Sequence, residues 1–379
     1  MSPFAIALAV ALAQANTPAA AADAPVVTAP VAAAAPQPAP EVPWWQKVTL
    51  SGYARIGLYY TLPLNTGQLV GGNGGFRLAD FRLGLDFHPV EKFSVTTSIE
   101  LAAPLVSDAD PLVGRSIVDL RDAYVTYSVC SGFNLRAGQQ RSPYDAEMLL
   151  PDGALPFVSR SILAVGLTPP DGYGPRLPLA PDRQLGLQIF SNRLGGDFGL
   201  KYAVGAFNSN GLNQLFNSNN YLAPVARVEV DFKQHVTLGV NANYVIRTDG
   251  TRPNLVNTNQ LGYGADLEVH GYGVSALVTY LANSSTYSYA GLQGDSAMGV
   301  MGQVRYFHEG TGLEVAARVA WLEPSRVQVQ DQVTEIAGMV GWKPFRLPFR
   351  VLAQYTHREE EAGVSYPNDS VDVMIHAVW

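Results

Sequence analysis

The stretch LEVAARVAW, residues 313–321, indicates the fold class by its pattern. Its odd-numbered residues are all apolar, whereas Glu314 and Arg318 stand at even positions. Alternation with a period of two is typical of a β-strand that has one apolar and one polar face. The pattern recurs in FRLGLDF (81–87), LGVNANY (238–244) and VDVMIHAVW (371–379). We expect about sixteen such strands between residues 48 and 379.

The composition leaves two fold classes open. Only 15% of the residues are charged and the mean hydropathy is +0.05, whereas ordinary soluble domains carry about 25% charged residues. After residue 44 no apolar run reaches the ~18 residues of a membrane helix. The alternatives are a soluble β protein and a barrel whose strands face lipid. The net charge of −7 argues against nucleic-acid binding, and a single cysteine, Cys130, excludes an internal disulfide.

The spacing of the connections favours the barrel. After every second expected strand the connection is short, as at residues 89–92, 130–132 and 233–235, and the connections between these are mostly long and polar. Outer-membrane barrels have this asymmetry, and lipid permits no open sheet edge. We therefore expect an all-β, closed antiparallel transmembrane barrel over residues 44–379, in the bacterial outer membrane. The strand at 117–129 changes parity halfway, which a β-bulge near Arg121 would correct.

The first 43 residues have a different character. The apolar run FAIALAVALA (4–13) and the following Ala-Gln-Ala predict a signal peptide over residues 1–15, although no Lys or Arg precedes the run. A short buried helix is the alternative. Residues 16–43 are almost all Ala, Pro and Val, so we expect an extended periplasmic linker.

A long connection follows the fifth expected strand, at residues 141–182. Loops of this length inside a domain are usually functional. It carries charged residues, among them Asp145, Glu147 and Arg160, and two apolar patches at 148–150 and 162–165. Since an extracellular loop would not need such patches, we expect the loop to fold into the barrel and narrow it. A surface flap or a subunit contact is the alternative.

Several segments carry a resemblance to a known family. These are RLADFRLGLDF (77–87), FSVTTSIELA (93–102), LRDAYVTY (120–127), LRAGQQRSPY (135–144), LPFVSRS (155–161) and YAVGAFNSNG (202–211). Their order resembles the phosphate-selective porin O and P family, over roughly residues 76–211. The resemblance implies a trimeric outer-membrane porin of about sixteen strands.

The charges on the lumen side depart from that family. Arg141 stands where the family usually has Lys, and no dense basic ladder is evident. By parity, eleven basic and ten acidic residues of this chain face the lumen, so their charges nearly cancel. The resemblance in fold therefore does not carry phosphate selectivity with it. The candidate pore-lining residues are Arg55, Asp80, Arg82, Arg136, Arg141, Asp145, Glu147 and Arg160.

Motifs of enzymatic chemistry are not found. The sequence holds no P-loop, H-E-x-x-H, G-x-S-x-G or EF-hand motif, and its six His are dispersed. We expect no catalytic residue, no metal site and no cofactor, although an enzyme on a smaller barrel stays open as an alternative. Asp266 and Glu268 share a lumen face by parity, which fits pore electrostatics better than acid–base catalysis.

The function that follows from these expectations is passive diffusion of small hydrophilic solutes and ions through a homotrimeric porin surrounded by outer-membrane lipid. One alternative is a substrate-selective anion or phosphate porin. The other is a structural or adhesive barrel that does not conduct.

Overall fold

The structure, a computed structural model, describes residues 43–62, 75–104, 116–166, 179–209, 216–217, 219–251, 254–287, 293–328, 331–344, 347–361 and 369–379. They belong to one compact unit, Pro43–Trp379. The expected signal peptide at residues 1–15 and the linker as far as residue 42 lie outside the described residues.

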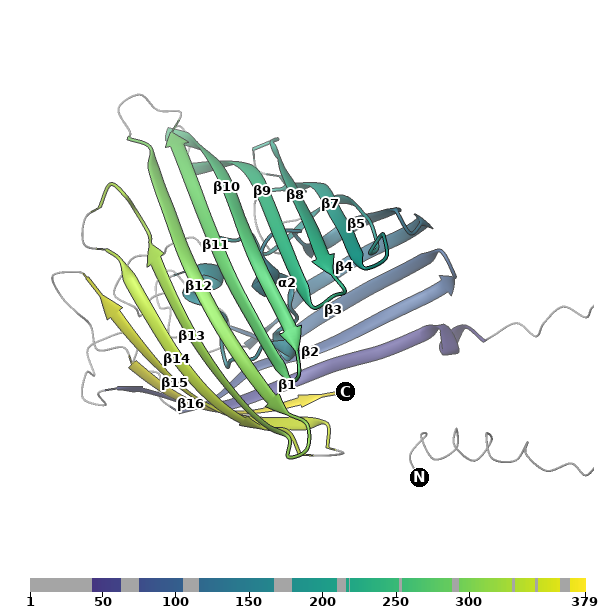
Figure 1. The fold of residues 1–379 in the computed structure, drawn as a ribbon. Coiled ribbons are helices and arrows are strands. Elements are labelled where there is room, and N and C mark those ends of the chain that lie inside the picture. Colours follow the sequence, from purple (N-terminus) through teal and green to yellow (C-terminus); the bar gives the residue numbers. More distant parts are fainter. Residues whose placement is uncertain are drawn as a thin grey trace, which may run out of the picture. The chain divides into compact units, whose positions relative to one another are not determined.

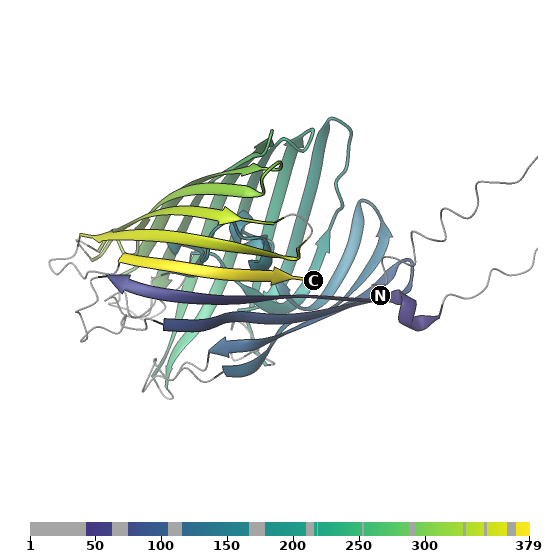
Figure 2. The same cartoon turned by 90° about the horizontal axis from the view of Figure 1, so that it is seen from below.

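Sixteen strands form one closed sheet in which each strand pairs antiparallel with its neighbours in sequence (Figure 1). The strands are β1 (Val48–Leu62), β2 (Gly75–Val90), β3 (Phe93–Pro104), β4 (Ser116–Cys130), β5 (Phe133–Arg141), β6 (Arg183–Phe190), β7 (Phe198–Asn208), β8 (Leu222–Phe232), β9 (Val236–Thr251), β10 (Asn254–Gly271), β11 (Val274–Tyr287), β12 (Asp295–His308), β13 (Leu313–Glu323), β14 (Val333–Trp342), β15 (Phe349–Glu360) and β16 (Asp369–Val378). β16 lies beside β1 and closes the sheet (Figure 2). The expected closed barrel is confirmed.

Helical segments are few and short. A 3-10 helix, η1 (Trp44–Lys47), precedes β1. Three further turns of helix, α2 (Ala146–Leu149), η2 (Asp152–Ala154) and α3 (Ile162–Val165), lie between β5 and β6. No helix in the described part of the chain has the length and apolar character needed to cross a membrane.

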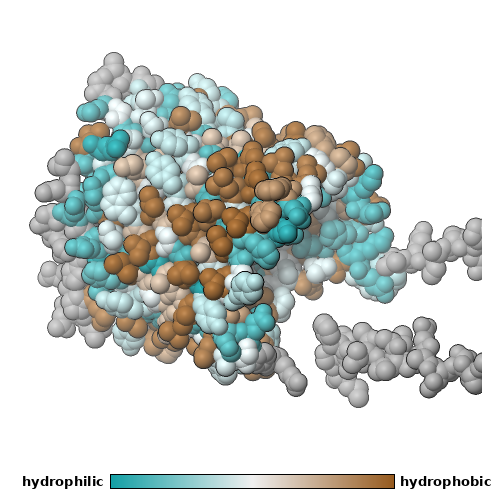
Figure 3. Space-filling view, viewed as in Figure 1, coloured by the Kyte–Doolittle hydropathy of each residue, from teal (hydrophilic) through white to brown (hydrophobic). Residues whose placement is uncertain are grey.

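Side chains alternate between the two faces of the sheet in the sense opposite to that of a soluble protein. On β13, Val315 and Val319 are 47% and 52% exposed on the outside, whereas the neighbouring charged residues Glu314 and Arg318 are each 1% exposed. Apolar side chains gather over the outer face of the strands (Figure 3). An apolar exterior around a polar interior is the pattern of a transmembrane barrel.

Short connections follow the even-numbered strands as expected, and most connections between them are longer, except that only residues 252–253 separate β9 from β10. Residues 91–92, 131–132 and 272–273 are all that separate β2 from β3, β4 from β5 and β10 from β11. In the last of these turns both Tyr272 and Gly273 have positive φ, 51° and 79°. Two successive positive φ values fit the type I′ turn, whose twist matches the flanking strands.

The expected β-bulge in β4 is confirmed. Ser98 of β3 pairs with Asp122, whereas the next residue, Ile99, pairs with Leu120. Arg121 is therefore the extra residue, and the shift returns Val118 and Val125 to the same, exposed face.

Candidate pore constriction

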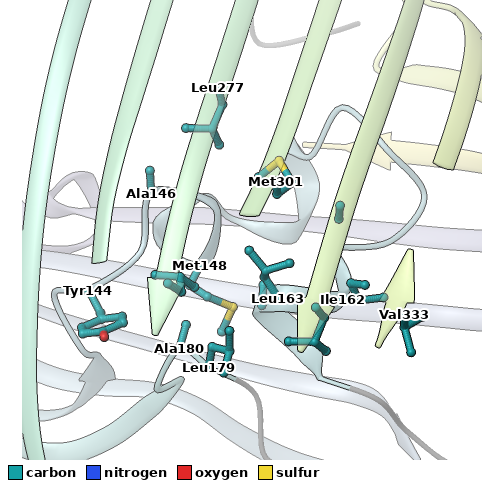
Figure 4. Packing of buried hydrophobic residues seen from close by; sticks show 14 of the residues in the cluster. Tyr144, Ala146, Met148, Ile162, Leu163, Leu179, Ala180, Leu277, Met301 and Val333 are labelled. Atoms are coloured by element: carbon teal, nitrogen blue, oxygen red, sulfur yellow. The ribbon is translucent and has the colours of Figure 1, made fainter. Parts of the chain in front are cut away.

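The described parts of the connection between β5 and β6, residues 142–166 and 179–182, lie against the inner wall of the barrel. Met148 of α2 and Leu163 of α3 are buried in one apolar cluster with inward-facing wall residues that include Leu277 of β11 and Met301 of β12 (Figure 4). The wall approaches α3 closely, since a Cβ added at Gly299 would lie 2.9 Å from Leu163 Cγ. Each apolar patch of the loop thus has residues that contact protein rather than water, namely Met148 in one and Ile162, Leu163 and Ala164 in the other, which stabilises the loop by hydrophobic burial.

A second cluster holds the middle of the loop on another part of the wall. Phe157 and Val158 pack against inward-facing residues of β13 to β16, namely Ala316, Ala337, Met339, Leu352 and Met374. The Val158 N–H donates to Gln354 Oε1 over 2.8 Å, and Arg318 Nη1 donates to the Ser159 carbonyl over 2.9 Å. The loop is therefore fixed at two sites by burial and by hydrogen bonds.

Asp152 of η2 is the charged centre of the loop. Its carboxylate lies 2.8 Å from Arg160 Nη2, 3.2 Å from Arg82 Nη1 and 3.5 Å from Arg141 Nη2. The hydroxyl of Tyr53 on β1 donates to the same carboxylate over 3.0 Å. Burial alone would raise the pKa of Asp152, but Arg160, Arg141 and Arg82 together hold it well below its usual range.

Two further ion pairs on the wall border this centre. Arg55 of β1 pairs with Asp80 of β2 and donates to the Val158 carbonyl over 3.0 Å. Arg82 also lies 3.2 Å from Glu100 of β3. The structure thus brings together five of the candidate residues. These are Arg55, Asp80, Arg82, Arg141 and Arg160.

Arg141 and Arg160 also hold the backbone of the loop. Both donate to the Leu150 carbonyl, Arg141 also to that of Met148, and Arg160 also to that of Glu147. Carbonyls at the end of a helix have no partner within the helix, and basic side chains satisfy them. These two arginines therefore hold the loop backbone in place by hydrogen bonds and also contribute positive charge to the loop.

The acidic candidates of the first half of the loop are buried. Asp145 caps α2 by accepting the Met148 N–H over 3.0 Å. Glu147 accepts the N–H of Ser161 over 3.0 Å and lies 3.7 Å from Arg318. Burial, then the neighbouring charge of Glu147, raises the pKa of Asp145 to about 7. Glu147 therefore contributes to the contact between loop and wall, and Asp145 to the fold of the loop itself.

Arg136 lies apart from the other candidates. Its guanidinium lies over the rings of Tyr124 and Phe190, 4.5 Å and 4.7 Å from their centroids, and its Nε donates to Thr126. These partners belong to β4 and β6, next to the short turn before β5. The structure does not bring Arg136 to the loop.

Strands β12 to β15 carry further ion pairs on the inner wall, in which one carboxylate serves two arginines. The alternation of the strands predicts that these residues face the lumen, but it does not predict which of them pair. Glu314 lies 2.6 Å from Arg305 and 3.5 Å from Arg350. Glu335 lies 2.9 Å from Arg318 and 3.2 Å from Arg358. Asp152 and Tyr53 were not among the candidates, because nothing in the sequence distinguishes this aspartate from the other loop acids.

Within the ion pairs that link Asp152, Asp80 and Glu100 to their arginines, the charges do not cancel. Four arginines, Arg55, Arg82, Arg141 and Arg160, stand against the three carboxylates of Asp80, Glu100 and Asp152, which leaves one positive charge. Among the described residues no group of three or more His, Cys, Asp or Glu could hold a metal ion. The region is a cluster of largely buried ion pairs between the loop and the wall.

A family model described as Gram-negative porin matches residues 9–334. Solved structures with a similar fold include the outer membrane channel DcaP of Acinetobacter baumannii, with a TM-score of 0.61 and 15% identity over 88% of this chain and 97% of that one. The anion-selective porin from Comamonas acidovorans has a TM-score of 0.59 and 12% identity over 88% and 99%. The trimer form of OmpT, an outer membrane protein of Vibrio cholerae, has a TM-score of 0.55 and 12% identity over 88% of this chain and 99% of that one. No curated protein matches the chain.

Proposed function

The chain belongs to the Gram-negative porin family, so it is a porin of the bacterial outer membrane that serves passive diffusion, and we propose that the loop at 141–182 forms the constriction of its pore. Small hydrophilic solutes and ions are the permeants of this proposal. The observation that carries it is the anchoring of the loop on the inner wall by two apolar clusters. A channel, not an enzyme, is the function that the family indicates, and we propose no catalytic activity.

A modest anion preference is the second part of the proposal. It is supported by the excess of one positive charge around Asp152 and by the sharing of Glu314 between two arginines. In a narrow passage a single charge biases permeation, because screening by water is weaker there than in bulk solution.

Phosphate selectivity is not part of the proposal, despite the resemblance to porins O and P. A phosphate site uses basic side chains that are available to several oxygens at once. Arg55, Arg82, Arg141 and Arg160 are each engaged by a carboxylate or by loop carbonyls. A preference for anions as a class is therefore the finer function that we propose.

Assembly as a homotrimer is proposed from the family resemblance, and OmpT of Vibrio cholerae is a similar fold recorded as a trimer. Reconstitution into planar bilayers tests assembly and conduction together. A trimer of independent pores inserts as one event and closes in three equal steps. A membrane insertion without any conductance would favour the structural or adhesive alternative instead.

The N-terminal assignments are also proposals. We propose that residues 1–15 are removed as a signal peptide and that residues 16–43 form a periplasmic linker. N-terminal sequencing of the protein purified from outer membranes should begin at Asn16. A mature chain that still carries residues 4–13 would contradict the first assignment, and strong hydrogen-exchange protection along 16–43 the second.

A further inference from the structure

A cavity of about 250 Å³ lies between the loop and the inner wall formed by β10, β11 and β12. The loop contributes Leu150, Ala154, Pro156 and Phe157 to its lining. His270 and Ser275 of the wall flank the short turn at 272–273, so the cavity faces the end of the barrel that carries the short turns. It is distinct from the arginine cluster around Asp152, none of whose side chains lines it.

The polar groups of the cavity wall stand on two successive inward-facing rungs of the sheet, which are two residues apart along each strand. In one rung Glu268 pairs with Leu277, and Leu277 pairs with Gln303. Two residues along the strands, on the same face, Ser275 stands between His270 and Arg305. Since adjacent strands are about 4.8 Å apart, the backbones of Glu268 and Arg305 lie about 12 Å from each other. An acidic group thus borders one side of the cavity and a basic group the other.

The basic side has spare capacity for an anion. Arg305 is 30% exposed and pairs with Glu314 over 2.6 Å. The same carboxylate also serves Arg350 at 3.5 Å, so two arginines share one negative charge. A carboxylate that enters the cavity can therefore accept hydrogen bonds from Arg305, whose positive charge Glu314 balances only in part.

The acidic side offers acceptors. The Glu268 carboxylate is 27% exposed and lies 3.5 Å from Nε2 of His270, which is itself half-exposed. Gln303 Oε1 is buried and has no hydrogen-bond partner among the described residues. A buried carbonyl oxygen without a partner is costly, so a donor from a solute would be favourable here. An ammonium group can supply donors to both side chains.

The loop side of the cavity is apolar. Phe157 is 1% exposed, and the guanidinium of Arg318 lies 4.5 Å from the centre of its ring. Leu150 and Pro156 extend this apolar surface, and Leu277 continues it on the wall. The cavity is small beside the ~300–1,000 Å³ of pockets for drug-sized ligands. It therefore suits one small solute with charged ends and an apolar body.

We propose that this cavity is a binding subsite for short zwitterionic peptides that carry an apolar side chain, such as a dipeptide. The peptide ammonium binds Glu268 and Gln303, the carboxylate binds Arg305, and the apolar side chain packs on Leu150 and Phe157. This inference rests on the proposed diffusion function and names a solute class for it. Oriented binding on the way through the pore makes the flux of such peptides saturable.

Block of single-pore potassium chloride current by three probes of nearly equal size tests the subsite. The probes are glycyl-phenylalanine, its N-acetyl derivative, which lacks the ammonium, and its C-terminal amide, which lacks the carboxylate. Glycyl-phenylalanine should block at a concentration at least about tenfold lower than either derivative, which corresponds to about 1.4 kcal/mol. Equal block by all three probes would overturn the proposal.

Two charge-neutralising variants assign the ends of the peptide. Glu268→Gln should weaken block by glycyl-phenylalanine and by its amide and leave the N-acetyl derivative unchanged. Arg305→Gln should weaken block by glycyl-phenylalanine and by the N-acetyl derivative and leave the amide unchanged. Glu229→Gln is the matched control, because Glu229 is a wall acid outside the cavity that pairs with Arg227 and Lys201.

The potassium chloride conductance of each variant separates the possible failures. A normal conductance with no discrimination between probes overturns the subsite and leaves the porin function standing. A wild-type protein that inserts without conducting contradicts the proposed function, and the subsite falls with it. Leu150→Ala, which removes apolar contact without altering charge, should weaken all three probes alike.

Discussion

At the scale of single residues, the carboxylate of Asp152 forms ion pairs with three arginines and accepts a hydrogen bond from the hydroxyl of Tyr53. Its partners come from β1, β2, β5 and the loop itself. One charge therefore joins the loop to three strands and also sets the local electrostatic balance. Removing the carboxylate and removing one of its arginines should have opposite effects on ion selectivity.

We expect Arg82→Gln to shift the reversal potential in a salt gradient towards cations, and Asp152→Asn to shift it towards anions. A unit charge about 5 Å from a permeating ion is worth roughly 0.8 kcal/mol even at the dielectric constant of water, which is about fourfold in permeability ratio. Planar-bilayer recording measures both shifts. Equal reversal potentials in the two variants would show that these charges do not face the ion path.

The pKa of Asp145 gives α2 a dependence on pH. Because the pKa is raised to about 7 from an ordinary value of 3.8, the folded loop holds the proton more tightly than the unfolded one. Its contribution is complete below pH 3.8 and is lost as the pH rises through about 7. Hydrogen exchange at the Met148 amide, corrected for intrinsic rates, should show protection that falls between about pH 4 and pH 7.

Asp145→Asn is the control for this dependence. Asparagine caps a helix about as well as aspartate but does not titrate in this range. The variant should keep its protection at pH 8, so its protection should vary little across the range. A fall as steep as in the wild type would assign the pH dependence to another group.

Pairing between residues could be predicted only in part. The alternation along the strands predicts that Arg55, Arg82 and Arg136 face the lumen. Whether each of them reaches the loop also depends on its position along the barrel axis. Arg136 stands five residues before Arg141, which is about 17 Å along a strand, and so it lies near the short turns rather than near the loop. Asp152 meets Arg82 across 70 positions of sequence, through the fold of a loop that has no periodic pattern.

At the scale of elements, the β5–β6 loop combines three short helical turns with two apolar contacts on the wall. Strands were predictable because one face of each meets an apolar exterior, so that every second residue carries the signal. The same signal located the bulge at Arg121, where the parity changes. The path of the loop was not predictable, because its apolar patches indicate burial without naming the surface that buries them.

Deletion of residues 151–178 should raise single-pore conductance several-fold, because it removes η2, α3 and the Phe157 anchor from the lumen. The barrel strands do not depend on this segment for their backbone pairing. Conductance steps in planar bilayers measure the effect, and resistance of the folded barrel to detergent confirms that the variant is intact. An unchanged conductance would mean that the loop does not limit the pore.

At the scale of the whole molecule, the barrel turns the usual distribution of side chains inside out. Its outer face presents residues such as Val315, Val319 and Ile336, each about half exposed. The inner face holds charges that are almost fully buried, such as Glu314 and Arg318. The effect of a new charge should therefore depend on which face, and which depth in the membrane, receives it.

Val319 lies near the middle of β13 and Leu313 at its start. Val319→Arg should destabilise the barrel by about 2–4 kcal/mol, whereas Leu313→Arg, close to the membrane surface, should cost about 0–1 kcal/mol. Equilibrium unfolding of the barrel in lipid bilayers by denaturant measures both. Equal losses of stability in the two variants would contradict the placement of Val319 deeper in the membrane than Leu313.

The pairing of β1 with β16, from Tyr53 and Val378 to Leu62 and Asp369, also bears on how the cell makes this protein. A chain shortened before β16 would leave the edges of β1 and β15 unpaired, and each unpaired backbone group in hydrocarbon costs several kcal/mol. Closure of the barrel therefore requires the last strand, so only a chain that includes β16 can insert into the membrane as a closed barrel. A truncated product should be left in the periplasm for degradation, instead of entering the outer membrane as a narrower, leaking pore.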